Sequence, residues 1–96
     1  MGSEASLEAA CCALAARAGA HPIKLATGLV GLPDRLFALP GGGVWFVEFK
    51  TLLGRLSPRQ KYVFEQMDKI GHPVTVIRHR GAFRKTLDMK LAATIR

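Results

Sequence analysis

The 96-residue sequence has few of the features that mark a disulfide-stabilised or zinc-binding protein. Its two cysteines, Cys11 and Cys12, are adjacent in a stretch with helical periodicity, so they are poor candidates for a disulfide bond with each other. There is no Cys-x-x-Cys pair, and His21, His72 and His79 lack metal-ligand spacing. These absences argue against a disulfide scaffold, a structural zinc site and a histidine-based metal centre.

The sequence also has no secretory signal pattern and no apolar run near the roughly 20 residues of a membrane span. Repeats and linkers are absent as well. We therefore predict an intracellular protein with one domain over residues 1–96, of which residues 1–3 are compatible with a cloning remnant. A chain this short buries a modest fraction of its surface, so a partner subunit or a bound ion is a plausible source of added stability.

Basic residues are in excess: 14 Lys and Arg stand against 7 Asp and Glu, for a net charge of +7 and a pI near 10.1. Basic surfaces gain affinity for phosphate by releasing counterions, so an anionic partner such as nucleic acid is expected. The alternative is a generic basic surface, because charge alone does not name a partner.

Hydrophobic periodicity predicts an α/β fold with a central mixed sheet flanked by helices, in the order α-β-β-β-α-β-α. The second helix has a clear start, with Ser57 as N-cap, Pro58 at the first position and Gln60 completing a capping box. The β-α-β step through 44–77 should be a right-handed parallel crossover. The predicted helices cover 4–18, 57–70 and 81–95, and the predicted strands cover 21–27, 34–39, 44–49 and 74–77.

The glycine-rich turn at 40–43 predicts a hairpin, but its register is open. Glu48 and Lys50 share a face of their strand because side chains alternate. If Leu39 pairs with Val44, Asp34 faces away from Glu48. A one-residue bulge in the glycine run would instead place Asp34 directly opposite Glu48.

Asp34, Glu48 and Lys50 are the residues that suggest chemistry. Two neighbouring carboxylates repel each other, and a hard cation such as Mg²⁺ relieves that repulsion through oxygen ligands. Such an ion activates water for phosphodiester hydrolysis, and a nearby lysine stabilises the developing negative charge. Taken singly, Asp34 is also typical of a turn and Lys50 of a solvated strand end. Glu48, however, lies in an apolar strand, where an acid without a partner is costly.

In order along the chain, Gly-x-Pro-Asp-Arg at 31–35, the glycine-rich turn, Val-Glu-Phe-Lys at 47–50 and Leu-Ser-Pro-x-Gln at 56–60 resemble the VRR-NUC domain of the PD-(D/E)xK nuclease superfamily. The resemblance covers nearly the whole chain. It implies a DNA endonuclease in which Asp34, Glu48 and the backbone carbonyl of Phe49 bind Mg²⁺ or Mn²⁺ and Lys50 is the catalytic lysine. Phe49 stands where an aliphatic residue is frequent, which should affect packing rather than chemistry.

The resemblance extends to three further positions. Glu8 matches an acidic metal-site residue on the first helix, with Glu4 as a weaker competitor; Gln60 matches a catalytic-site glutamine; and Lys24 matches a basic position before the Pro-Asp loop. Each has a structural alternative, since an acid near a helix start is stabilised by the helix dipole and Gln60 already serves a capping box.

Basic residues near the loops are expected to contact DNA phosphates. Stand-alone chains of this size resemble junction resolvases, so the resemblance implies a homodimer acting on branched DNA, with the apolar tail at 91–95 as a candidate self-association surface. A DNA-binding module without activity and a flap or linear-duplex nuclease remain the alternatives. The predicted DNA-binding residues are Lys24, Arg35, Arg55, Arg59, Lys61, Arg80 and Arg84, with Arg78 and Lys85 in the same clusters.

Overall fold

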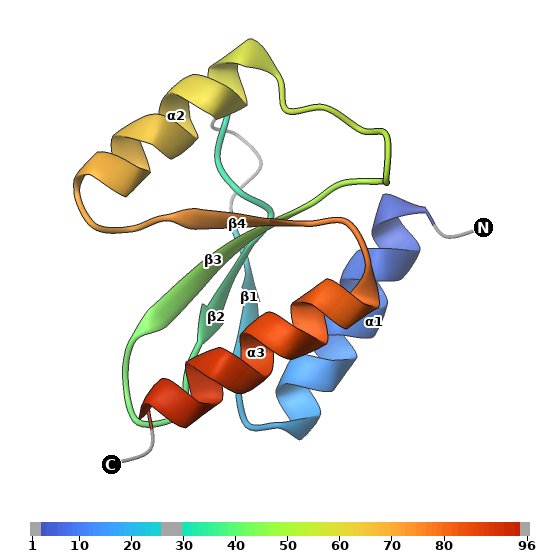
Figure 1. Ribbon diagram of the computed structural model, residues 1–96, viewed down its shortest axis with the longest axis vertical. Helices are drawn as coiled ribbons and strands as arrows, with labels where there is room; N and C mark the ends of the chain where they lie inside the picture. The colour runs from blue at the N-terminus through green and yellow to red at the C-terminus, as the bar shows by residue number, and fades with distance from the viewer. Residues whose placement is uncertain (1–2, 26–29, 95–96) are drawn as a thin grey trace.

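The computed structural model describes residues 3–25 and 30–94 and confirms the predicted order of elements (Figure 1). Within those ranges no helix is both long and apolar enough to cross a membrane. The elements are α1 (Glu4–Arg17), β1 (His21–Lys24), β2 (Arg35–Ala38), β3 (Val44–Phe49), α2 (Pro58–Lys69), β4 (Val74–Ile77) and α3 (Arg80–Thr94).

The four strands form one mixed sheet in the order β1-β2-β3-β4. The β1–β2 and β2–β3 pairs are antiparallel, whereas β3 and β4 are parallel and joined through α2. Helices α1 and α3 lie side by side against one face of the sheet, and α2 lies on the other side (Figure 1). This arrangement gives the sheet two different faces.

The face under α1 and α3 carries the hydrophobic core. Phe37 and Trp45 from the sheet meet Phe83 of α3, with the Trp45 and Phe83 rings stacked at a centroid distance of 5.0 Å. The small side chains of Cys11 and Ala15 are fully buried and allow α1 to pack closely. The core therefore requires alternate residues of β3 to be apolar, which leaves the intervening residues free for the other face.

The opposite face carries Leu36 and Phe46 in register, and Glu48 further along β3. Helix α2 covers the β4 side of this face, with Phe64 as its buried residue. Ser57 accepts a hydrogen bond from the Gln60 N–H, so the predicted capping box is present and starts α2 beside the end of β3.

The hairpin resolves the open register. Ala38 pairs with Val44, and the Leu39 N–H donates to the Gly43 carbonyl, so the loop is one residue longer than a Leu39–Val44 pairing would leave. The glycines at 41–43 all have φ between +85° and +110°, a region that L side chains rarely adopt. The Leu39–Val44 register is therefore wrong, and the pairing puts Asp34, just before β2, opposite Glu48. The predicted strand 21–27 ends at Lys24, and residues 26–29 lie outside the described residues.

Candidate functional site

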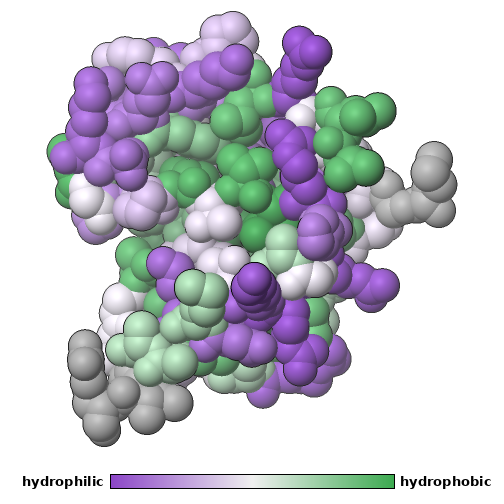
Figure 2. Space-filling model, in the orientation of Figure 1, coloured by the Kyte–Doolittle hydropathy of each residue, from purple (hydrophilic) through white to green (hydrophobic). Residues whose placement is uncertain are grey.

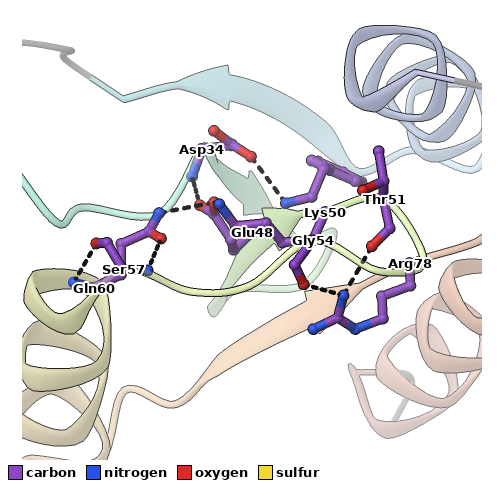
Figure 3. A network of polar contacts seen from close by, with 9 residues as sticks. Asp34, Glu48, Lys50, Thr51, Gly54, Ser57, Gln60 and Arg78 are labelled. Atoms are coloured by element: carbon purple, nitrogen blue, oxygen red, sulfur yellow. Dashed lines mark hydrogen bonds and ion pairs between the residues drawn. The ribbon is translucent and has the colours of Figure 1, made fainter.

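Asp34 and Glu48 meet where β2 begins and β3 ends. The Asp34 N–H donates to Glu48 Oε1 at 3.1 Å, and Asp34 Oδ2 accepts from the Phe49 N–H at 2.8 Å (Figure 3). Each of the two acids that the sequence singled out thus accepts a hydrogen bond from a backbone N–H of the other's strand region: Glu48 from Asp34, and Asp34 from the residue after Glu48. Both lie at one end of the two central strands, next to the start of α2.

The loop before Asp34 is fixed by close packing on α2. Gly31 has φ +94°, and a Cβ there would lie 2.8 Å from Val63 Cγ2 and 3.1 Å from the Arg59 carbonyl oxygen. Pro33 is buried next to it. The Gly-x-Pro-Asp pattern therefore has a local structural reason: the glycine permits close approach to α2, and the loop then delivers Asp34 to Glu48.

Glu48 is a buried acid with a full set of partners. It is only 3% exposed, and its Oε2 accepts from Gln60 Nε2 at 2.9 Å and lies 3.4 Å from Lys50 Nζ. Burial and repulsion from Asp34 raise the pKa of Glu48, and the contacts with Gln60 and Lys50 only partly oppose this. A bound cation would stabilise the ionised form of Glu48, which burial and the neighbouring Asp34 disfavour.

Gln60 combines the two roles that the sequence presented as alternatives. Its Oε1 accepts from the Ser57 N–H in the capping box, while its Nε2 donates to Glu48. One amide therefore ties the start of α2 to the orientation of the Glu48 carboxylate (Figure 3).

Phe49 contributes through its backbone, because its side chain is buried in the core. Its N–H faces Asp34, whereas the next N–H, of Lys50, donates to the Ile77 carbonyl on the β4 side. In a strand, a residue's N–H and C=O point to the same neighbour, so the Phe49 carbonyl emerges on the Asp34 side.

These oxygens fit a small divalent cation. In residues 3–25 and 30–94, no cluster of three or more His, Cys, Asp or Glu side chains could hold a metal ion. Mg²⁺, however, commonly uses one or two carboxylates and completes its shell with waters and substrate phosphate. Two carboxylates and one backbone carbonyl match that requirement.

Glu8 takes part in an ion-pair network with two basic residues. Its Oε2 is 2.9 Å from Lys24 Nζ and 2.6 Å from Arg35 Nε. By the alternation of side chains along the strands, Lys24 and Arg35 lie on the sheet face that α1 and α3 cover. Asp34 and Glu48 lie on the opposite face. Burial by itself raises the pKa of Glu8, but the hydrogen bonds and charges of its two partners outweigh burial and lower it.

We expect Glu8→Gln to lower the free energy of unfolding by about 1–2 kcal/mol at pH 7, because two charge-assisted bonds are lost. Because the pKa of Glu8 is lowered in the folded protein, its charge stabilises the fold at pH values above its unfolded-state pKa, near 4.5. This stabilisation is lost as the pH falls through the folded-state pKa. The difference between wild type and variant should therefore narrow below pH 4.5 in urea titrations at several pH values.

Glu4→Gln is the matched control, since Glu4 is an exposed acid of the same helix. Glu4→Gln should lower the free energy of unfolding by less, and its difference from wild type should not narrow as the pH falls. Cleavage measured on the same proteins separates the roles: an activity loss for Glu8→Gln as deep as for a change at Glu48 would assign Glu8 to the metal site.

The predicted phosphate-contacting residues fall into two groups. Lys24 and Arg35 are partly neutralised by Glu8. Arg59 lies over the Tyr62 ring at 5.4 Å, and Arg84 is 4.0 Å from Asp88, both on the surface. Six of the other predicted residues are exposed: Arg55, Arg59, Lys61, Arg80, Arg84 and Lys85.

Arg78 has a role that sequence reasoning missed. It was grouped with the phosphate-contacting residues, but its Nη1 donates to the carbonyls of Thr51, Leu52 and Gly54 at 2.8, 3.3 and 2.6 Å. Figure 3 shows the contacts with Thr51 and Gly54. The sequence signal for Arg78 is its position directly after the β-branched run that forms β4. Arg78 holds the loop that follows Lys50.

Comparison with known proteins gives one informative result. No family model matches the sequence, and no curated protein matches it. A solved structure described as "VRR_NUC domain" matches with a TM-score of 0.80 and 27% sequence identity, covering 91% of this chain and 97% of that one. The chain is a structural match to a VRR_NUC domain. The resemblance predicted from the sequence is thereby confirmed.

Proposed function

We propose that this protein is a divalent-metal-dependent DNA endonuclease that hydrolyses phosphodiester bonds. The observation that supports it most is the contact between Asp34 and the nearly fully buried Glu48, with Lys50 Nζ 3.4 Å from the same carboxylate. A purely structural site has little reason to bury an acid next to a second acid. The VRR_NUC match agrees with this reading.

In this proposal Asp34, Glu48 and the Phe49 carbonyl hold Mg²⁺ or Mn²⁺. When bound, the ion supplies Lewis acidity and makes water a better nucleophile at neutral pH. Lys50 orients the attacking water or stabilises the negative charge that builds on the phosphate. Gln60 keeps the Glu48 carboxylate oriented through its 2.9 Å hydrogen bond, so it acts as a positioning residue.

We further propose a homodimer that acts on four-way junctions. One site makes one cut, whereas symmetric resolution of a junction needs two cuts on opposed strands, which a two-fold dimer supplies. The radius of gyration of 13.0 Å is small beside a junction, and a dimer doubles the basic surface. The apolar tail contributes less to this argument, because Leu91 packs against the core and residue 95 lies outside the described residues.

The test is cleavage of labelled four-way, flapped, nicked and linear DNA with Mg²⁺, Mn²⁺ or EDTA, with light scattering of the same samples. We expect products only with a divalent ion, the highest rate on the junction, and the mass of a dimer. DNA binding that is indifferent to metal, with no product, would identify a DNA-binding module. A monomer that cuts flaps or linear duplex but not junctions would overturn the junction proposal alone.

A further inference from the structure

The chain makes a tightly held turn immediately after Lys50. The Gly54 N–H donates to the Thr51 carbonyl at 3.1 Å and closes the turn. Arg78, directly after β4, donates to the carbonyls of both of these residues (Figure 3) and also to the carbonyl of Leu52. A side chain from a neighbouring strand thus fixes three carbonyls of this short segment.

The two middle residues of this turn are large, apolar and exposed. Leu52 is 73% exposed and Leu53 is 89% exposed. Such positions favour Gly, Pro, Asn, Asp or Ser, and an exposed leucine contributes nothing to the core. Figure 2 shows a hydrophobic patch where this loop runs in Figure 1, bordered by hydrophilic residues. A rigid turn that presents two leucines to solvent is suited to contact another molecule.

The surroundings of the turn favour a nucleic acid as that molecule. Arg55 follows the turn and is exposed. A groove of about 630 Å³ borders it, lined in part by Thr51, Leu52, His79 and Arg80. The lining combines an apolar surface with basic and hydroxyl groups, which suits a base attached to its phosphate. A protein partner would have no comparable need for the basic rim.

We propose that the Leu52–Leu53 turn is a wedge that inserts at a weakly stacked base step beside the phosphate to be cut, and that the adjacent groove receives the displaced base. The proposal rests on the nuclease function proposed above and explains how the site prefers branched DNA. Inserted apolar side chains unstack bases at a cost that is lower where stacking is already interrupted. At a junction, flap or nick this cost is small, whereas continuous duplex resists insertion.

The test uses 2-aminopurine placed at the branch point of a junction, with binding followed in EDTA so that no cleavage occurs. Wild type should raise the 2-aminopurine fluorescence on binding. The double variant Leu52→Ser/Leu53→Ser should remove most of that rise and weaken junction binding by roughly tenfold or more, because two apolar contacts are lost. Ile70→Ser is the matched control, since Ile70 is 75% exposed at the far end of α2; it should behave as wild type.

Each outcome decides the proposal. Tight binding by wild type without a fluorescence change, or no DNA binding at all, would overturn the wedge. A change of molar mass in the leucine variant, with junction fluorescence retained, would instead make the leucines a self-association surface. A normal fluorescence response with no product after adding Mg²⁺ or Mn²⁺ would leave the wedge standing and overturn the nuclease function. Unchanged thermal unfolding of the variant shows that the fold is intact.

Discussion

Glu48→Gln and Asp34→Asn are each expected to lower the rate of DNA cleavage by at least about three orders of magnitude, since loss of a metal ligand removes several kcal/mol of transition-state stabilisation. Both substitutions keep the shape of the side chain and remove its charge. Lys50→Ala should lower the rate by about 10²–10³-fold, because it removes one group that stabilises developing charge. Single-turnover cleavage with saturating Mg²⁺ or Mn²⁺ measures all three.

Glu65→Gln is the control, because Glu65 is an exposed acid of α2. It should retain full activity. Near-normal turnover by either Asp34→Asn or Glu48→Gln at saturating metal would remove the metal-ligand assignment.

A second readout separates a ligand role from a structural one. Burial and Asp34 raise the pKa of Glu48, so the ionised carboxylate lowers stability at pH values above that pKa. A divalent ion should offset this and raise the melting temperature of wild type, as any ligand of the folded state does. Glu48→Gln should lose that metal-dependent increase while remaining folded.

The sequence predicts the order of elements and the α2 start because both depend on local patterns. The apolar run of β3 and the Ser57–Gln60 capping box are short-range features, and the structure contains both. The hairpin register depends on whether the loop that contains the glycines is one residue longer or shorter. That difference decides whether Asp34 lies opposite Glu48 or faces away from it. Three consecutive glycines permit several turn geometries, so local sequence does not select among them.

Long-range contacts were the least predictable. Glu8 reaches Arg35 across 27 positions, and Arg78 reaches Gly54 across 24. Helix position identifies Glu8 as a candidate acid but does not say which face of the sheet it approaches. In the same way, an arginine in a basic cluster cannot be distinguished by sequence from one that holds a loop. Both distinctions follow only from which strands are neighbours.

The affinity for DNA should fall by about 10²–10³-fold between 50 and 200 mM salt if about five phosphates are neutralised, because each adds close to 0.9 to the slope of log K against log salt. The expected contributors are the exposed residues Arg55, Arg59, Lys61 and Arg80. Lys24 and Arg35 should contribute less, since Glu8 already neutralises part of their charge. Fluorescence anisotropy with labelled DNA over a salt series measures the slope.

Single substitutions locate the interface. Arg59→Ala and Arg80→Ala should each reduce the slope by about 1 and weaken binding to all sequences alike, as expected for a phosphate contact. Arg17→Ala is the control, because Arg17 is an exposed basic residue at the C-terminal end of α1 and is not among the predicted DNA-binding residues. If Arg17→Ala changed the slope as much as Arg59→Ala, the basic charge would act as a diffuse field rather than as a defined interface. A flat affinity across the salt series would contradict an electrostatic interface altogether.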